Sequence, residues 1–377
     1  MKVRTAQITA LCLCFLFLLS GFVRTLLHPD SEIYYENRPA NRIGTFSTAS
    51  MLDGSYQDSV EAALADQAPL AVKMKKLYNI FDVGVALSFA RSLASHGRYV
   101  GFRKYYFFRD MLVLRPNSRT ELLDSSCELI NTWAAASPET EFYLYYIETD
   151  RDLNLETGKK SGNYECFTSA LSLSDSHISR LEINSYEDYR RDFLATDHHW
   201  NANGAYRAYL DICSMLGIAP LETDGIYTDH GRYLGTRAAG IEGLAPEDFS
   251  VVLYHYAPLT ISSLGIHAQD YGQLERFVSG QLPAFSYGSV YGGDGGEILF
   301  QCPSGTGNAL ILGDSYDNAI LKALAAGFAE TWSVDLRAYD ADSGLHFDLT
   351  SYIEQHDIDL VLFIGGIDFY SSTLLIS

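Results

Sequence analysis

Apolar and polar positions repeat along much of the chain in a way that predicts strands and helices in turn. The expected elements are strands at 105–114, 142–147, 309–312, 332–336 and 360–364 and helices at 119–135, 316–328 and 349–355. Strands that alternate with helices form a mainly parallel sheet with helices on both faces. The pattern therefore predicts an α/β fold.

The N-terminus carries the strongest concentration of apolar residues. Lys2 and Arg4 precede a nearly unbroken apolar run at 8–23, which is the layout of a signal peptide or signal anchor. The apolar character continues past Arg24, whose long side chain can reach the membrane interface. We expect an uncleaved anchor at 1–27, with the chain that follows outside the cytoplasm. A cleaved secretory peptide is the alternative.

The rest of the chain is expected to consist of a stalk and a globular domain. Residues 28–80 form the stalk and a lead-in helix, the helix being indicated by apolar positions three and four apart at 56–78. The globular domain is expected at 81–377. Within it, the Gly- and Tyr-rich range 217–304 has no clear period and suggests an insertion of loops and short antiparallel strands.

Charge and cysteine content narrow the classes of partner. The 27 Lys+Arg against 47 Asp+Glu give a formal charge of -20, which opposes extended contact with a phosphate backbone, so no nucleic acid is expected. Two of the six cysteines lie in the apolar N-terminal run, and the others are too scattered for a metal site. Disulfides and buried free thiols both remain open for them. No cofactor is expected.

One candidate site is the tripeptide Gly313-Asp314-Ser315. It follows the expected strand at 309–312 and precedes the expected helix at 316–328. The carboxyl edge of a parallel sheet is where α/β proteins bind ligands, and N–H groups at a helix start can hold a developing oxyanion. Taken alone, the tripeptide is more often a helix cap than a catalytic site.

A second candidate site is the segment Thr196 to Asn201, which contains Asp197-His198-His199-Trp200. A serine nucleophile needs a base that takes its proton, and a carboxylate that orients this base. Residues two apart in an extended or turning segment project to the same side, so Asp197 can reach one ring nitrogen of His199 while the other nitrogen faces a distant serine. His198 is then expected to point away.

Two other interpretations of this segment compete with the catalytic one. Asp197 can cap the helix expected at about 202–216. The aspartate and the two histidines are also possible zinc ligands, but adjacent histidines seldom converge on one ion without a distant third ligand. The spacing of His177, His230 and His255 recommends none of them for that role. No metal is therefore expected.

The two motifs together resemble a known family. Asp197-His198-His199-Trp200 resembles the signature of the DHHW family, and Gly313-Asp314-Ser315-Tyr316 resembles its partner motif. Shorter segments that resemble the same family lie at 36–39, 52–56, 66–67 and 335–339, so the similarity covers most of the exported part. The chain is thus similar to the SGNH hydrolase-like proteins, whose best understood relatives of this kind are the alginate O-acetyltransferases.

The resemblance implies a role for each motif residue. Asp197 corresponds to the orienting acid, His199 to the base and Ser315 to the nucleophile. Because the acid and the base precede the serine, the resemblance implies a circularly permuted SGNH fold with three α/β/α layers. The alginate enzymes commonly carry a small residue where this chain has His198, so the choice of base between the two histidines stays open, with His199 favoured.

Secondary candidates follow from the same resemblance. SGNH enzymes use further groups to bind the oxyanion, and Arg337, Tyr339, Gly365 and Gly366 follow expected strand ends on the correct edge of the sheet. Asp314 is a secondary candidate because it precedes the serine. Turn and surface roles remain the competing interpretation of these residues.

The implied activity is acyl transfer through a covalent intermediate on Ser315, with an acetyl group passing to an extracytoplasmic polysaccharide. In such systems a polytopic membrane acyltransferase commonly supplies the acetyl groups, which would explain a membrane anchor. A carbohydrate esterase that removes acetyl groups is the first alternative. A non-catalytic polysaccharide-binding or assembly protein is the second.

Overall fold

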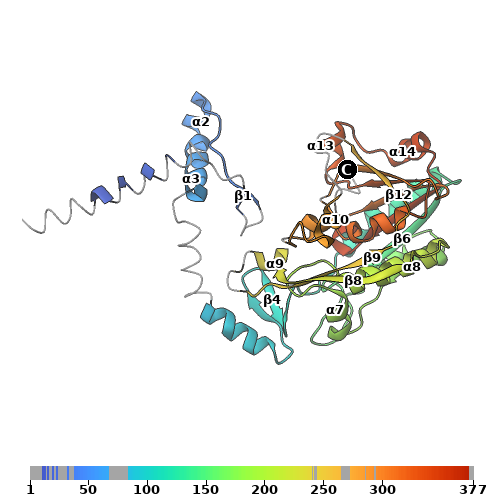
Figure 1. Cartoon of the computed structure of the whole chain (residues 1–377), viewed down its shortest axis with the longest axis horizontal. Coiled ribbons are helices and arrows are strands. Elements are labelled where there is room, and N and C mark those ends of the chain that lie inside the picture. The colour runs from blue at the N-terminus through green and yellow to red at the C-terminus, as the bar shows by residue number, and fades with distance from the viewer. Residues whose placement is uncertain are drawn as a thin grey trace, which may run out of the picture. The chain divides into compact units, whose positions relative to one another are not determined.

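The computed structural model describes residues 11–13, 15–16, 19–20, 23, 32–33, 38–67, 84–239, 241, 244–264, 272–284, 286–292 and 294–372. The chain divides into a smaller unit, Met1–Ala90 with Ala238–Leu244, and a larger unit, Arg91–Arg237 with Ala245–Ser377. Both candidate motifs lie in the larger unit. Figure 1 shows the chain coloured from its N-terminus to its C-terminus.

The smaller unit contains short elements from the expected stalk. Its strands and helices include β1 Glu32–Ile33, β2 Arg38–Pro39, α2 Thr48–Leu52 and α3 Ser55–Gln67. The backbone and side chain of Asn41 both donate to Asp66 Oδ2 of α3, at 2.8 and 3.0 Å. The rest of the helix expected at 56–78 and most of the expected anchor at 1–27 lie outside the described residues. No helix among the described residues is long and apolar enough to cross a membrane.

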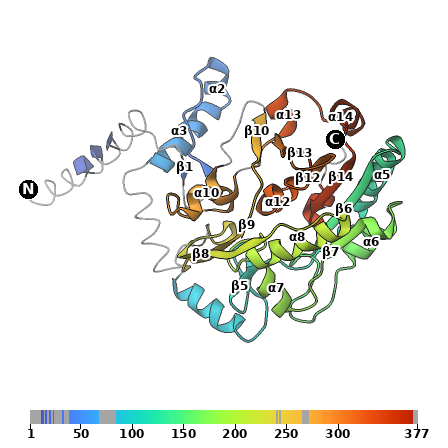
Figure 2. The ribbon, with the colours of Figure 1, turned by 45° about the vertical axis from the view of Figure 1, so that its right-hand side comes forward.

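The larger unit is built on a mixed sheet with the strand order β10-β11-β13-β12-β14-β6-β7, seven strands within the described residues. The strands are β6 Glu141–Ile147, β7 Ile178–Leu181, β10 Thr260–Leu264, β11 Glu297–Gln301, β12 Asn308–Gly313, β13 Glu330–Val334 and β14 Leu360–Gly365. The run from β13 to β7 is parallel. At one edge of the sheet β11 pairs antiparallel with both β13 and β10. Figure 2 shows the larger unit with β10, β13, β12, β14, β6 and β7 labelled. The predicted α/β class with a mainly parallel sheet is confirmed.

Both faces of this sheet are buried under helices. In β12, Ile311 packs with side chains of α8 and α12 on one face, and the next residue back, Leu310, packs with α5 and α14 on the other. These helices are α5 Thr120–Ala136, α8 Ala202–Leu216, α12 Leu321–Ala325 and α14 Leu349–His356. Burial on both faces explains why the strands appear in the sequence as unbroken apolar runs.

The expected single strand at 105–114 is wrong. The segment forms two strands, β4 Tyr105–Phe108 and β5 Met111–Val113, in an antiparallel sheet with β3 Val100–Phe102 that is separate from the main sheet. The chain reverses at Arg109, which takes a left-handed φ of 50°. The turn carries the charged pair Arg109-Asp110, which interrupts the apolar run and marks where the two strands divide.

The range 217–304 contributes a long ribbon and the antiparallel edge of the sheet. Strands β8 Thr223–Tyr233 and β9 Glu247–Tyr254 pair antiparallel and run side by side in Figure 1. The short helices α9 Thr236–Ala239, α10 Gln273–Val278 and α11 Tyr287–Tyr291 also come from this range. The turn from β8 into α9 and the start of α11 contribute residues to the candidate site.

Candidate active site

Ser315 lies two residues after the end of β12, at the point where the sheet changes its direction of winding. The strands that follow it in the chain, β13 and β14, lie on opposite sides of β12. Ligands of open α/β sheets bind beside the carboxyl end of such a strand. The fold therefore presents Ser315 at a typical ligand-binding position.

A tight turn holds the serine. The Tyr316 N–H donates to Asp314 Oδ1 at 3.2 Å, and the Asp317 N–H donates to the Asp314 carbonyl at 3.0 Å. A Cβ on Gly313 would lie 2.1 Å from Asp317 Oδ2, so only glycine fits where the strand enters this turn. Burial raises the pKa of Asp314 to about 6.

The predicted start of the helix at 316 is wrong, because the helix begins later in the chain. A short 3-10 turn, η3 Asp317–Ala319, follows the serine, and α12 begins only at Leu321. Ile320, with a φ of -118°, separates the two. Ser315 is therefore held by a turn and does not lie at the N-terminus of an α-helix.

The histidine segment forms a loop between α7 Tyr186–Asp192 and α8. The loop closes on itself through an antiparallel bridge between Phe193 and Trp200. Asn201 caps α8, because its side chain accepts hydrogen bonds from the N–H groups of Asn203 and Gly204. Asp197 is not the helix cap and is available for another role.

The loop and the turn bring Asp197, His199 and Ser315 together. His199 Nδ1 lies 2.8 Å from Asp197 Oδ1, and His199 Nε2 lies 2.8 Å from Ser315 Oγ. Both distances are those of good hydrogen bonds. The three side chains thus form a continuous hydrogen-bonded chain from a carboxylate through an imidazole to a hydroxyl.

Asp197 is fully buried and surrounded by donors. Besides the His199 ring, its carboxylate accepts hydrogen bonds from the hydroxyl groups of Tyr233 and Thr236 and from the backbone N–H groups of His198, His199 and Thr236. Burial alone would raise the pKa of Asp197, but the charge of His199 and the hydrogen bonds from both histidines hold it well below its usual value. The group is a carboxylate at neutral pH.

His199 is buried and fixed in orientation. Burial, together with the neighbouring His198, lowers the pKa of His199 to about 4, so its ring is neutral at neutral pH. Because Nδ1 faces a carboxylate, the proton resides there, and the lone pair on Nε2 faces the hydroxyl of Ser315. A neutral imidazole in this tautomer can accept the serine proton.

His198 does not point away, in contrast to the expectation. Its Nδ1 lies 3.0 Å from Asp197 Oδ1 and 2.9 Å from Thr236 Oγ1, and its ring packs tilted against that of His199 with centroids 3.8 Å apart. The loop turns tightly enough at Asp197 that both following side chains fold back onto the same carboxylate oxygen. His198 and His199 therefore share one partner.

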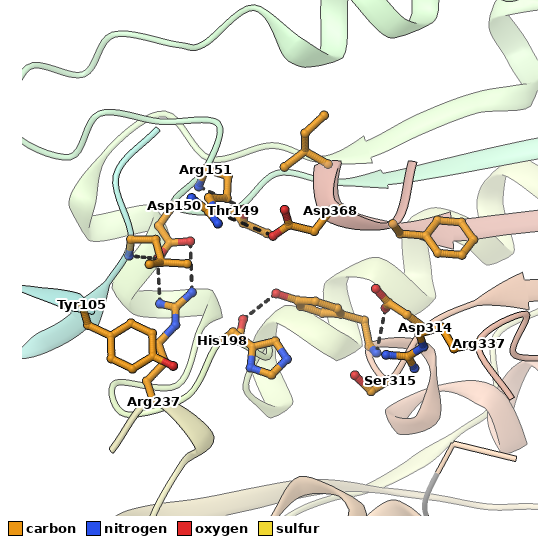
Figure 3. A pocket seen from close by; sticks show the side chains of 15 residues that line it. Tyr105, Thr149, Asp150, Arg151, His198, Arg237, Asp314, Ser315, Arg337 and Asp368 are labelled. Atoms are coloured by element: carbon orange, nitrogen blue, oxygen red, sulfur yellow. Dashed lines mark hydrogen bonds and ion pairs between the residues drawn. The ribbon is translucent and has the colours of Figure 1, made fainter. Parts of the chain in front are cut away.

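A pocket of about 320 Å³ opens over this group, and His198, Asp314, Ser315 and Arg337 are among the residues that line it. Figure 3 shows His198 beside Ser315 in this pocket. Of the secondary candidates, Tyr339 is not in the pocket: it is buried among aromatic side chains under the sheet. The size is at the lower end of the range for small-molecule sites.

Some of the remaining secondary candidates line the pocket and others do not. Gly366 follows β14 and lines the pocket, whereas Gly365 packs against Phe369. Arg337 follows β13 and is held by two carboxylates: its Nε donates to Asp335 Oδ1 at 2.9 Å and its Nη2 to Asp294 Oδ2 at 2.7 Å. It is a fixed cation in the wall of the pocket.

The aspartate and the two histidines also lie close enough together to be candidate metal ligands. One ligand atom from each of Asp197, His198 and His199 lies within 4.8 Å of the others. His230 and His255, whose spacing did not recommend them as distant ligands, pair with Asp248 and Asp224. The ring nitrogens that face Asp197 are already engaged in hydrogen bonds, which favours the acid–base arrangement over an ion.

Several residues that complete the site were not predicted. Tyr233 and Thr236 donate to Asp197, and the ring of Tyr287 stacks on His199 with centroids 3.9 Å apart. Glu247 holds the same loop by accepting from the N–H and hydroxyl groups of Thr196. All four come from the range 217–304 or its ribbon, where the sequence has no motif that would have identified them.

Comparisons with known proteins agree with this architecture. No protein-family model and no curated protein matches the chain. Among solved structures, Bacillus cereus PatB1 with a sulfonyl adduct is similar, with a TM-score of 0.55 and 18% identity over 74% of this chain and 97% of that one. A DHHW family protein from Eubacterium siraeum has a TM-score of 0.54 and 17% identity, over 74% of this chain and 94% of that one.

These similarities show that the chain shares its fold with PatB1 and with a DHHW family protein, so the predicted relation is confirmed at the level of the fold. The O-acetyltransferase domain of Pseudomonas putida AlgJ, over 70% of this chain and 87% of that one, reaches a TM-score of only 0.37 at 13% identity. That value is too low to argue a common fold.

Proposed function

We propose that the protein is a serine O-acyltransferase that acetylates a polysaccharide outside the cytoplasm, with a circularly permuted SGNH-like fold. Ser315 is the nucleophile, His199 the base and Asp197 the acid that orients the base. The observation that carries the proposal is the pair of 2.8 Å hydrogen bonds that join Asp197 to His199 and His199 to Ser315. Serine, base and orienting carboxylate are recognised by this geometry and not by their order in the chain.

In the first half-reaction, Ser315 Oγ attacks the carbonyl carbon of an acetyl ester while His199 Nε2 takes the hydroxyl proton. The tetrahedral intermediate collapses, the bond to the leaving oxygen breaks, and His199 gives its proton to that oxygen. The products are the free alcohol of the donor and an acetyl group on Ser315. The Asp197 carboxylate stabilises the imidazolium that exists between the two proton transfers.

In the second half-reaction, a hydroxyl group of the acceptor gives its proton to His199 Nε2 and its oxygen bonds to the acetyl carbon. The bond to Ser315 Oγ breaks, and the serine oxygen takes the proton back from His199. If the acceptor is a sugar the enzyme is a transferase, and if it is water the enzyme is an esterase. The motifs of the alginate O-acetyltransferases, which this chain resembles, favour transfer to a sugar.

The proposed location of the reaction, outside the cytoplasm, is argued from the sequence. The apolar run at 8–23 behind Lys2 and Arg4 supports a membrane anchor and an extracytoplasmic site. A polytopic membrane acyltransferase is the proposed source of the acetyl groups. No part of the mechanism requires a metal or an organic cofactor.

The test is intact-mass spectrometry of the full chain in detergent after exposure to an activated acetyl ester. A gain of about 42 Da, the mass of one acetyl group on a serine, is expected, and it should be absent from Ser315→Ala. Ser304→Ala, which removes an exposed serine after β11, is the matched control and should keep the gain. A sulfonyl fluoride gives a second probe of the same hydroxyl, suggested by the adduct named for PatB1.

If Ser315→Ala, shown by circular dichroism to be folded, still gains the mass of an acetyl group, Ser315 is not the nucleophile. No gain with either probe in the wild-type chain would favour a non-catalytic binding protein. When the gain is present, the rate at which added saccharides discharge the acetyl group, relative to water, separates the transferase from the esterase.

A further inference from the structure

The triad leaves one imidazole of the site without a function. His198 lies within hydrogen-bond distance of the same Asp197 oxygen as His199, at 3.0 Å against 2.8 Å. Its side chain is 39% exposed and lines the pocket, whereas that of His199 is only 5% exposed. A second imidazole in this position can contact whatever the pocket binds.

The hydrogen-bond partners of His198 determine which of its nitrogens faces the pocket with a lone pair. Thr236 has one hydroxyl proton, and it donates this proton to Asp197 Oδ1 at 3.0 Å. The Thr236 oxygen can therefore only accept from His198 Nδ1, which lies 2.9 Å away. In the neutral ring, Nδ1 carries the proton and Nε2 is the acceptor.

The two histidines consequently both present an Nε2 lone pair on the side away from Asp197. Both Nδ1 atoms face Asp197, and the ring centroids are 3.8 Å apart with the planes tilted by 36°. In an imidazole the Nε2 lone pair points roughly opposite to the Nδ1–H bond, so in both rings it points away from the carboxylate. The lone pair of His199 faces Ser315 Oγ at 2.8 Å. His198 lines the pocket, where Figure 3 shows it beside Ser315. Two adjacent acceptors suit two adjacent donors.

We propose that His198 binds a second hydroxyl group of the acceptor, next to the reacting one, so that the site selects a vicinal diol. This inference rests on the proposed function and adds to it the class of acceptor. The reacting hydroxyl donates its proton to His199, as in the second half-reaction, and the neighbouring hydroxyl donates a hydrogen bond to His198 and keeps its proton. Water and simple alcohols cannot make both contacts from one molecule.

His198 is thus a specificity residue that favours transfer to a sugar over hydrolysis. A hydrogen bond of this kind contributes about 1 kcal/mol, which corresponds to a preference of roughly fivefold to tenfold. The preference appears in the partition of the acyl-enzyme between acceptor and water. That ratio does not depend on how fast the acyl-enzyme forms.

The experiment measures this partition with full-length protein acetylated by the activated ester. The competing acceptors are cis- and trans-1,2-cyclohexanediol and cyclohexanol, and the products are acetylated alcohol and free acetate. For the wild type we expect at least one of the diols to be acetylated about fivefold to tenfold faster than cyclohexanol. In His198→Ala the preferred diol should fall to the level of cyclohexanol, with cyclohexanol little changed relative to water.

Two further variants keep the result from depending on one substitution. Thr236→Val removes the hydroxyl that fixes the His198 proton and should lose most of the diol preference, while Thr236→Ser should restore it. His230→Gln, which alters an exposed histidine paired with Asp248 on the β8–β9 ribbon, is the matched control and should behave as wild type.

The outcomes separate this inference from the proposed function. If the wild type forms no acyl-enzyme, the proposed function fails and the inference fails with it. If the acyl-enzyme forms but neither diol is preferred, or if the preference persists unchanged in His198→Ala, the triad stands and the role of His198 is overturned.

Discussion

The ring of Tyr287 lies flat on the imidazole of His199, with centroids 3.9 Å apart and planes only 4° from parallel. The tyrosine is itself fixed, because Trp200 Nε1 donates to its hydroxyl oxygen at 3.0 Å and this hydroxyl lies 3.3 Å from the Tyr316 carbonyl. The tryptophan of the Asp-His-His-Trp motif therefore acts indirectly. It holds the Tyr287 ring, and this ring orients His199.

Tyr287→Leu should lower kcat by roughly 10- to 100-fold, because the His199 ring would lose the surface that keeps Nε2 aligned with the serine. Tyr287→Phe keeps the ring and should retain most of the activity. Steady-state kinetics on an acetyl ester, with thermal unfolding as a check of folding, distinguish the two. Equal losses in both variants would mean that the hydroxyl and not the stacking is what counts.

Asp197→Asn should be the most damaging single change to the triad that keeps its shape. The amide cannot accept from all the donors around it, and it permits the wrong tautomer of His199, for which a loss of about 10⁴ in kcat is typical. It also leaves buried donors such as the Tyr233 hydroxyl without an anionic acceptor, which costs about 1–3 kcal/mol. Single-turnover acylation rates and denaturant unfolding measure the two effects.

A retained acylation rate in a folded Asp197→Asn variant would contradict the role of this carboxylate. Asp248→Asn is a useful control, since Asp248 also accepts from a histidine, His230, but is 56% exposed on the surface. It should change neither the rate nor the stability by much.

The sequence allowed the sheet and the triad candidates to be predicted for different physical reasons. Buried parallel strands are apolar at consecutive positions, so β6, β12 and β14 could be located from runs such as 309–312. Asp197, His199 and Ser315 were identified because chemistry demands these residue types in two short motifs. Neither argument depends on contacts between distant parts of the chain.

The rest of the site depends on such contacts. Tyr233, Thr236 and Tyr287 reach Asp197 and His199 only because the β8–β9 ribbon and α11 fold over the loop, and single tyrosines and threonines carry no local signal. The orientation of His198 was mistaken because only residues two apart were expected to project to the same side, whereas the loop turns so tightly at Asp197 that both histidines face it. The helix at 316 was mistaken because apolar spacing continues through the turn that Asp314 stabilises.

The activity should have an unusually acidic lower limit. His199 must be neutral to accept a proton, and burial with the neighbouring His198 lowers its pKa to about 4. As the pH falls through about 4 the ring becomes protonated and kcat/KM should drop. Between about pH 5 and neutrality kcat/KM should not change with pH. A pH profile with circular dichroism at each pH tests this. A midpoint near the ordinary histidine value of about 6.5 would show that the base is solvated in the working enzyme.

Gly235 allows the turn before α9 to reach the Asp197 segment. A Cβ at this position would lie 2.3 Å from the Thr196 carbonyl oxygen and 2.6 Å from Asp197 Cβ. Gly235→Ala must therefore push Thr236 away from the carboxylate, and we expect at least a tenfold loss of acylation rate together with a lower melting temperature. Gly84→Ala, where a Cβ meets no atom of the described residues within 4 Å, is the control and should leave both unchanged. Normal acylation by Gly235→Ala would mean that the loop can move without disturbing the triad.

We propose that Arg337 stabilises the oxyanion of the tetrahedral intermediate. It follows β13, the strand beside the one that carries Ser315, and lines the same pocket. Its hydrogen bonds to Asp335 and Asp294 keep the guanidinium fixed, so no reorganisation is needed when negative charge develops. Arg337→Met should lower kcat by about 10²- to 10³-fold with a smaller effect on KM, as the loss of one oxyanion donor does. Arg232→Met removes an exposed arginine from the ribbon and should have no such effect. A change in KM alone for Arg337→Met would assign the arginine to substrate binding instead.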